Sequence, residues 1–319
     1  MTPYILFFLG FILLIKGADW LVSGASSLAY RFGISALVVG LTIVAFGTSA
    51  PELVVSLLAS LAGNTDIAIG NITGSNIANI LLILGISAII YPLAVQKSTV
   101  WKELPFALLA VLLLLLVAND QFVDGASASM ISRIDGLVLL AFFVIFLYYI
   151  FSTAFSSPAE KDGGTAIGFA PLRVTLQIIG GMAGLVIGGK WIVDGAVLFA
   201  SSLGVSEALV GLTIVAVGTS LPELATSAVA AYKKNVDIAV GNIVGSNIFN
   251  VFWILGLSAV VTPLPFSVSS NIDLVVAIGA TILLFLALFV GRKHTVEKWQ
   301  GVVFVILYVL YIGYVVIRG

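Results

Sequence analysis

Residues 40–93 read GLTIVAFGTSAPELVVSLLASLAGNTDIAIGNITGSNIANILLILGISAIIYPL, and residues 211–264 repeat them as GLTIVAVGTSLPELATSAVAAYKKNVDIAVGNIVGSNIFNVFWILGLSAVVTPL. The two copies align without a gap at an offset of 171, with 33 identities in 54 positions. The identities concentrate on GTSxPEL and GNIxGSNIxN, the polar parts of otherwise apolar segments. In a membrane protein, a duplicated pair of polar, Gly- and Pro-interrupted segments indicates the binding site of a secondary transporter.

The composition places the chain in a membrane. It has 319 residues, of which 61% are hydrophobic and 9% charged, whereas a soluble protein carries roughly a quarter charged residues. The net charge of −1 suggests no nucleic-acid partner, and the absence of cysteine excludes disulfides and thiolate sites. The single His294 lies in a polar connection, which excludes a histidine-centred site. Lys16 and Asp19 interrupt the first apolar segment, so we expect a retained helix there and no signal peptide.

The hydropathy pattern predicts an all-α membrane protein with ten transmembrane helices, arranged as two five-helix halves, residues 1–152 and 172–319. The polar stretch 153–171 between them is a short cytoplasmic linker that cannot hold a folded domain. The predicted spans are 4–30, 36–62, 66–91, 103–118, 134–152, 172–201, 207–231, 237–261, 270–290 and 299–317.

The basic residues predict the orientation, because cytoplasmic loops carry an excess of Lys and Arg. With both termini outside, the outer loops hold only Arg133 and Arg318. The inner loops then hold Arg31, Lys97, Lys102, Lys161, Arg173, Lys233, Lys234, Arg292, Lys293 and Lys298. We therefore expect both termini on the outer side of the membrane.

The position of the repeats predicts an inverted topology. Thr48 and Thr219 lie five crossings apart, and an odd number of crossings reverses direction. The copies would then be related by a two-fold axis in the membrane plane, an arrangement that favours alternating access over a simple pore.

GTSAPEL (47–53) and GTSLPEL (218–224) predict breaks in the second and seventh helices. Pro51 and Pro222 each remove a backbone donor, and Glu52 and Glu223 place a costly carboxylate near mid-membrane. The plain alternative is a kinked helix whose hydroxyls bond to the carbonyls it frees. Because the carboxylate is present in both copies, an ion site is the stronger hypothesis. The nearby hydroxyls are those of Thr48, Ser49, Thr219 and Ser220.

GNITGSNIAN (70–79) and GNIVGSNIFN (241–250) contain paired glycines, which we expect to break the third and eighth helices as well. The spacing i, i+4 places Ser75 beside Asn79 and Ser246 beside Asn250, so these pairs are the ligand candidates. For Asn71, Asn76, Asn242 and Asn247 we expect interhelical hydrogen bonds.

Together these groups form a set of carboxylate, hydroxyl and amide oxygens without sulfur or imidazole. Hard cations such as Ca²⁺ and Na⁺ prefer such ligands. Two carboxylates neutralise one Ca²⁺, whereas three Na⁺ would leave one positive charge. No nucleophile and base accompany the carboxylates, so we expect no enzyme activity and no cofactor beyond the transported ions.

The motif pair GTSAPEL and GNITGSN, with its second copy, resembles the α-repeats of the sodium/calcium exchangers in the cation/Ca²⁺ exchanger superfamily, prokaryotic type. The resemblance implies Na⁺/Ca²⁺ antiport by alternating access, with Ca²⁺, Na⁺ and the lipid bilayer as partners and no obligate protein partner. It also implies a prokaryotic plasma-membrane location, and a core of eight helices with the first and sixth spans as a sliding gate. The implied ion ligands are Ala45, Thr48, Ser49, Glu52, Gly74, Ser75, Asn79, Ala216, Thr219, Ser220, Glu223, Gly245, Ser246 and Asn250.

Some alternatives remain open. K⁺-dependent members of the superfamily carry Asp at the position of Asn250, as do some K⁺-independent prokaryotic members, so Asn250 argues against a K⁺ requirement. Proton/calcium antiport through the same glutamates is the alternative within the class, and a passive cation channel is the alternative from another class. The linker is too short for the regulatory calcium-binding loop of the animal exchangers.

The remaining intramembrane features have plainer interpretations. We expect Lys16, Asp19, Lys190 and Asp194 to form local pairs or to reach toward the headgroups rather than to bind ions. Glycines 180, 184 and 188 form a small-residue stripe on the sixth span. This stripe is either a tight-packing surface or a sliding gate surface.

Overall fold

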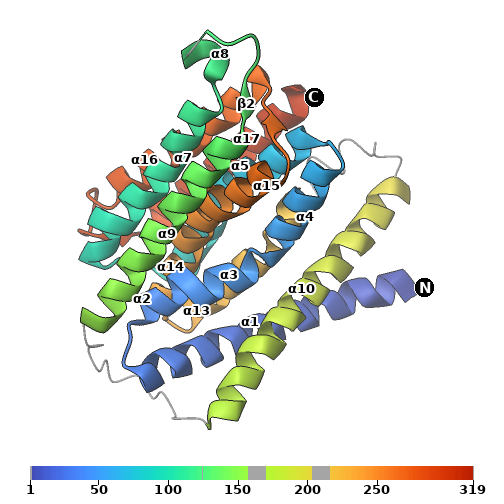
Figure 1. The fold of residues 1–319 in the computed structure, drawn as a ribbon. Helices are drawn as coiled ribbons and strands as arrows, with labels where there is room; N and C mark the ends of the chain where they lie inside the picture. Colours follow the sequence, from blue (N-terminus) through green and yellow to red (C-terminus); the bar gives the residue numbers. More distant parts are fainter. Residues whose placement is uncertain (1, 124, 157–169, 203–215, 319) are drawn as a thin grey trace.

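The computed structural model describes residues 2–123, 125–156, 170–202 and 216–318, and this part of the chain is almost wholly helical (Figure 1). Eight of its helical runs are long and apolar enough to cross a membrane, and the bent pair Ala36–Thr48 and Ala50–Leu61 makes a ninth. The protein is therefore an all-α, multi-pass membrane protein. The seventh predicted span, 207–231, includes residues outside the described part, so the count of ten helices stays a prediction.

The first half contains α1 (Thr2–Phe32), α2 (Ala36–Val39), α3 (Ala45–Thr48), α4 (Ala50–Leu61), α5 (Thr65–Ile77), α6 (Gly85–Ile90), α7 (Leu104–Val117), α8 (Asp120–Val123) and α9 (Arg133–Ser156). Three π-helical segments join these helices: η1 (Gly40–Val44), η2 (Ala78–Leu84) and η3 (Thr99–Glu103).

The second half contains α10 (Pro171–Ser202), α12 (Ala216–Thr219), α13 (Leu221–Tyr232), α14 (Val236–Ile248), α15 (Gly256–Val261), α16 (Asn271–Ala287) and α17 (Lys298–Arg318). Between them lie the π-helical segment η5 (Phe249–Leu255) and the 3₁₀ turn η6 (Val268–Ser270).

Two short antiparallel strand pairs connect loops that are far apart in the sequence. Strand β1 (Leu93–Ala94) pairs with β4 (Thr295–Val296), and β2 (Met130–Ile131) pairs with β3 (Leu264–Pro265). Each pair joins two loops that the span prediction places on the same side of the membrane. The pairing is therefore consistent with the predicted order of crossings.

The spans Thr65–Ile90 and Val236–Val261 form the centre of the molecule. In their most apolar stretches 78% and 83% of residues are buried, against 22–39% for the other unbent spans. Both runs carry the GNIxGSN motif, so polar residues are brought to the most buried position in the fold.

These two central spans are continuous, so the expected breaks in the third and eighth helices are wrong. At the motif the α-helix passes into the π-helical segments η2 and η5, and the helical backbone is kept, with Ala78 at φ −59°, ψ −42°. Glycine weakens a helix by only about 1 kcal/mol. The prolines that could break these spans, Pro92 and Pro263, lie beyond their ends.

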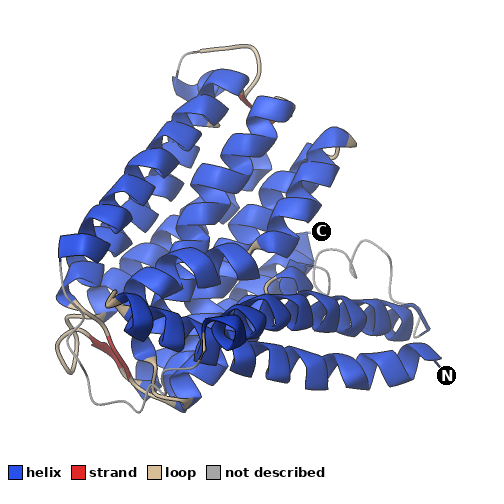
Figure 2. Cartoon of the chain, turned by 60° about the horizontal axis from the view of Figure 1, so that its bottom comes forward, coloured by secondary structure: helices blue, strands red, loops and turns tan. Residues whose placement is uncertain are grey.

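Helices α1 and α10 pack against each other and lie together on one side of the other helices (Figures 1 and 2). A Cβ added to Gly17 would lie 2.8 Å from Gly181 O, and one added to Gly188 would lie 2.8 Å from Gly10 O. Such distances require glycine. The contact stripe on α10 therefore runs through Gly181, Gly184 and Gly188, whereas the predicted Gly180 only touches the Trp20 ring.

Lys190 and Asp194 form a local pair, as predicted, whereas Asp19 pairs with a residue of another helix. Lys190 pairs with Asp194 one turn along α10 at 3.0 Å. Asp19 pairs with Lys233 at 2.6 Å, which ties α1 to the end of α13. The Lys233 ammonium also donates to the Ser23 hydroxyl at 2.9 Å.

Candidate functional site

The two GTSxPEL motifs break their helices at a serine. Ser49 separates α3 from α4 with φ −81°, ψ 8°, and the helical run Ala36–Thr48 meets α4 at a bend of 47°. Ser220 separates α12 from α13 with φ −88°, ψ 6°. Pro51 and Pro222 lie in the first two positions of the new helices, where a missing N–H costs least.

The break places a glutamate in the first turn of each new helix. Glu52 in α4 and Glu223 in α13 are each only 1% exposed. The free N–H groups and the dipole of a helix N-terminus favour a negative charge there. The local sequence thus supplies a position where a buried carboxylate is tolerated.

Each carboxylate accepts one hydroxyl hydrogen bond from its own repeat and one from the other repeat. Glu52 Oε1 accepts from Ser75 (3.4 Å) and from Ser220 (3.2 Å). The two hydroxyls are themselves 3.1 Å apart. The corresponding bonds of the second copy join Glu223 Oε1 to Ser246 (3.4 Å) and to Ser49 (3.1 Å).

The motif threonines also bond across the repeats. The Thr48 hydroxyl donates to Asn242 Oδ1 (2.9 Å), and the Thr219 hydroxyl donates to Asn71 Oδ1 (3.2 Å). Asn71 in turn donates to the Ser56 hydroxyl (3.0 Å). Asn242 donates in the same way to Ser227 (3.0 Å).

The motif asparagines complete the contact between the copies. Asn79, the second residue of η2, donates to Asn247 Oδ1 (2.8 Å). Asn250, the second residue of η5, donates to Asn76 Oδ1 (3.0 Å). The interhelical hydrogen bonds predicted for the other four asparagines are therefore present.

Ten buried side-chain oxygens in the described part of the chain lack a hydrogen-bond partner, and four of them belong to predicted ion ligands, as two pairs 171 residues apart: Glu52 Oε2 with Glu223 Oε2, and Asn79 Oδ1 with Asn250 Oδ1. An unpaired buried acceptor is costly. Two carboxylate and two amide oxygens are, however, the ligand type that hard cations prefer. This arrangement suits a desolvated cation better than it suits a structural hydrogen-bond network.

Three of the four predicted backbone ligands have carbonyls that take part in helix hydrogen bonds. Ala45 O accepts from the Ser49 N–H (3.0 Å) and the Thr48 hydroxyl (3.3 Å). Gly74 O accepts from the Ala78 N–H, and Gly245 O from the Phe249 N–H. A carbonyl has two lone pairs, so these bonds are compatible with a ligand role. Ala216 is the first residue of α12.

Gly245 has a packing role as well. A Cβ there would lie 2.8 Å from Leu41 O and 2.8 Å from the Ala45 Cβ. The glycine therefore lets α14 approach the segment that ends at the first helix break. For Gly245 close packing accounts for the residue type, and a ligand role stays a prediction.

The motifs did not predict a role for Ser56 and Ser227, which support the asparagines of the site. The two serines are identical in the two copies although most of the surrounding residues differ, as in LVVSLLA and LATSAVA. That isolated identity was a usable signal. The Ser56 hydroxyl accepts a hydrogen bond from Asn71, and the Ser227 hydroxyl accepts one from Asn242. These two asparagines are the acceptors for Thr219 and Thr48.

The chemistry of the site is limited to oxygen ligands. Among residues 2–123, 125–156, 170–202 and 216–318, no group of three or more His, Cys, Asp or Glu could hold a metal ion. Two carboxylates surrounded by neutral oxygens suit a cation that passes through better than a permanently held transition metal.

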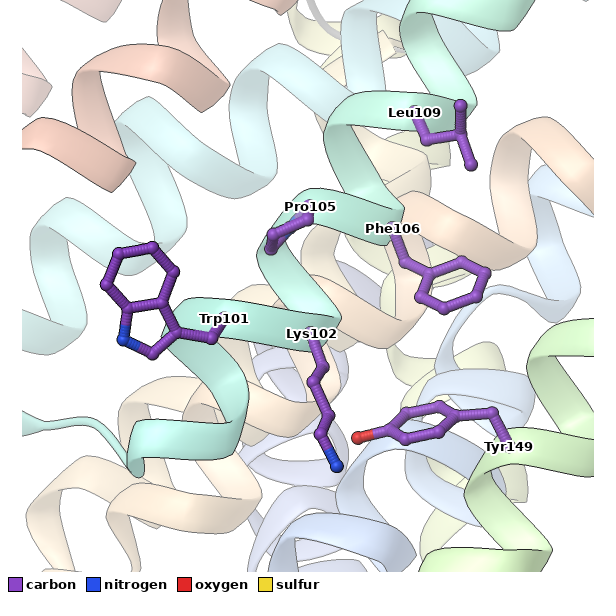
Figure 3. A pocket seen from close by; sticks show the side chains of 6 residues that line it. All are labelled: Trp101, Lys102, Pro105, Phe106, Leu109 and Tyr149. Carbon is purple, nitrogen blue, oxygen red and sulfur yellow. The ribbon is translucent and has the colours of Figure 1, made fainter.

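A surface hollow of about 370 Å³ lies elsewhere, lined by Trp101, Lys102, Pro105, Phe106, Leu109 and Tyr149 (Figure 3). None of the predicted ion ligands lines it. Beside it the Tyr149 hydroxyl donates to Glu103, a third buried carboxylate, and the Lys102 ammonium lies 5.3 Å from the centre of the Tyr149 ring. The hollow is mainly apolar. The candidate ion site therefore remains the region around the Glu52 and Glu223 carboxylates.

Comparison with known proteins gives one family. The family model described as sodium/calcium exchanger protein matches residues 2–152 and 173–317. The putative antiporter CaxA of Alkalimonas amylolytica is 38% identical over 313 residues, covering 96% of this chain and 95% of its own. The sodium/calcium exchanger MaX1 of Methanosarcina acetivorans is 32% identical over 342 residues, covering 97% of each chain.

The fold is also similar to that of a solved structure. The sodium-calcium exchanger NCX_Mj, in a structure soaked with Na⁺ and Sr²⁺, superposes with a TM-score of 0.83 at 36% identity. The match covers 98% of this chain and 97% of the solved one. The similarity therefore extends over the whole helical arrangement and not only over the repeats.

Proposed function

Because this chain belongs to the sodium/calcium exchanger family, we propose that it is a secondary antiporter that exchanges Na⁺ for Ca²⁺ across the membrane. The relatives that it matches are an antiporter and exchangers rather than enzymes. The observation that carries the proposal is the set of four buried, unpartnered oxygens on Glu52, Glu223, Asn79 and Asn250. They lie where the two repeats meet, and their charge and hardness match Ca²⁺ and Na⁺.

The ligand set accounts for exchange in terms of charge. The two carboxylates offset the +2 charge of one Ca²⁺, and hydroxyl and carbonyl oxygens replace part of the hydration shell. Several Na⁺ ions can occupy the same oxygens in its place, since Na⁺ is also a hard cation. Two kinds of ion that compete for one pair of glutamates would be transported alternately, which is antiport.

The cross-repeat contacts support alternating access. They occur in exchanged pairs: Ser49 bonds to Glu223 as Ser220 bonds to Glu52. Such reciprocity is expected of two halves, 1–152 and 172–319, related by a two-fold axis. With five crossings per half that axis lies in the membrane plane, and the halves can exchange conformations to open the site to either side. The distribution of basic residues supports an orientation with both termini outside, and the prokaryotic relatives support a location in the plasma membrane.

Uptake of ⁴⁵Ca²⁺ into proteoliposomes tests the proposal. An outward Na⁺ gradient should drive uptake, and removal of K⁺ should not affect it, because Asn250 stands where K⁺-dependent relatives carry Asp. Liposomes without protein and liposomes with equal Na⁺ on both sides are the controls.

Two outcomes would contradict Na⁺ coupling. Uptake driven equally well by a pH gradient in Na⁺-free buffer would favour proton/calcium antiport through the same glutamates. Uptake without any counter-gradient would favour a passive channel. An absolute K⁺ requirement would leave the exchanger intact and refute the interpretation of Asn250.

A further inference from the structure

Four asparagines form one hydrogen-bonded group between the two central spans. Asn76 and Asn79 come from α5 and η2, and Asn247 and Asn250 come from α14 and η5. All four are at most 3% exposed. A buried amide has an oxygen face and an NH₂ face, so its orientation decides whether it can bind a cation.

Two backbone carbonyls fix the orientation of the Asn76 and Asn247 amides, which form the inner pair of the group. Asn76 Nδ2 donates to Asn247 O (3.2 Å), and Asn247 Nδ2 donates to Asn76 O (3.3 Å). A backbone carbonyl can only accept a hydrogen bond. The NH₂ group of each amide must therefore face the carbonyl, and its Oδ1 must point elsewhere.

The orientation of the inner pair in turn determines that of the outer pair, Asn79 and Asn250. Asn247 Oδ1 faces Asn79 and needs a donor, which Asn79 Nδ2 supplies at 2.8 Å. Asn76 Oδ1 receives Asn250 Nδ2 at 3.0 Å in the same way. The Oδ1 atoms of Asn79 and Asn250 are left without a hydrogen-bond partner, like the second oxygens of the two glutamates.

We propose that Asn76 and Asn247 are positioning residues, which orient the amides of Asn250 and Asn79 so that an oxygen and not an NH₂ group is presented to the transported cation. The inference rests on the proposed function and adds to it the residues that set ligand orientation. If the Asn79 amide were reversed, its oxygen would face Asn247 Oδ1, and two acceptors would oppose each other. Its NH₂ group would then stand where a cation needs a ligand.

The inference predicts that Asn247→Leu weakens Ca²⁺ binding without removing any proposed ligand. Leucine is close to asparagine in size but gives Asn79 no acceptor, so the amide can reverse. Loss of a residue that orients a metal ligand typically lowers affinity by about 10- to 100-fold, and we expect a loss in that range. The measurement is ⁴⁵Ca²⁺ equilibrium binding to purified protein in detergent, with Asn76→Leu as the equivalent variant of the other repeat.

Asn119→Leu is the matched control. Asn119 and Asn271 also form a reciprocal amide pair, with both hydrogen bonds at 2.7 Å, but away from the glutamates. This variant should lose comparable hydrogen bonding and keep the Ca²⁺ affinity of the unmodified protein. Thermal melting of all variants separates loss of fold from loss of affinity.

A double-mutant cycle with Asn79→Asp separates orientation from general structural support. A carboxylate presents an oxygen in either orientation, so in the Asn79→Asp background Asn247→Leu should no longer weaken binding. An equal loss in both backgrounds, or an equal loss in Asn119→Leu, would overturn the inference while leaving Ca²⁺ exchange in place. Failure of the unmodified protein to bind Ca²⁺ would overturn the proposed function and this inference with it.

Discussion

Glu52 and Glu223 occupy equivalent positions, and each binds hydroxyls with one oxygen and leaves the other unpartnered. We expect Glu52→Gln to abolish Ca²⁺ uptake, because it removes one of only two proposed carboxylate ligands. The amide is nearly isosteric, and its oxygen can still accept from Ser75 and Ser220. The melting temperature should therefore stay close to that of the unmodified protein. Proteoliposome uptake and thermal melting in detergent measure the two quantities.

Glu103→Gln is the control for this substitution. Glu103 is equally buried and hydrogen-bonded, to Tyr149, but lies outside the proposed site. It should transport Ca²⁺ at close to the unmodified rate. Uptake near that rate by Glu52→Gln, at comparable protein levels, would remove the basis of the site hypothesis.

The sequence predicted which residues take part in the candidate ion site but not which residues they bond to. The repeated motifs identified the glutamates and the Ser75–Asn79 spacing, because a duplicated polar residue in an apolar span needs a reason. They did not predict that Ser49 bonds to Glu223 rather than to Glu52. A contact between residues 174 positions apart depends on how the two halves pack, and spacing along one helix carries no information about it.

Proline and glycine affect the transmembrane helices differently, so only one of the two predicted kinds of helix break is present. Pro51 and Pro222 coincide with breaks because proline removes a hydrogen bond and clashes with the preceding turn. The paired glycines of the other motif only weaken a helix, and the π-helical segments η2 and η5 accommodate the strain without a break. Such segments frequently mark functional positions. They have no reliable sequence signature, so they were not predicted.

Packing between α1 and α10 also gives a testable prediction. Gly17→Ala places a Cβ 2.8 Å from Gly181 O and from Leu185 N, and neither backbone atom can move alone. Overpacking of this kind costs about 1–3 kcal/mol, so we expect a lower melting temperature. Gly279→Ala in α16, where an added Cβ meets nothing within 4 Å, should leave it unchanged or slightly raised. An unchanged melting temperature in Gly17→Ala would mean that α1 and α10 are not tightly packed in the membrane.

For the whole molecule, the two long helices are not equivalent in this conformation. Helix α1 packs along α13, whereas α10 has no comparable packing against α4 in the described residues. The ion pair between Asp19 and Lys233 belongs to that asymmetry. Their counterparts 171 residues away are Lys190 and Ala62, which cannot form such a pair. If the halves exchange conformations, the contact between α1 and α13 must open.

Covalent restraint of that contact should therefore stop transport. We expect Asp19→Cys with Lys233→Cys, joined by a short bifunctional thiol reagent that reduction can cleave, to lose Ca²⁺ uptake and to regain it on reduction. The chain contains no cysteine, so the pair needs no altered background. A cross-link between Asn119→Cys and Asn271→Cys joins the α7–α8 turn to α16, away from α1, and should leave uptake intact. Because alternating access requires the two halves to exchange their contacts, undiminished uptake with α1 fixed to α13 would show that the site is reached without separating these helices.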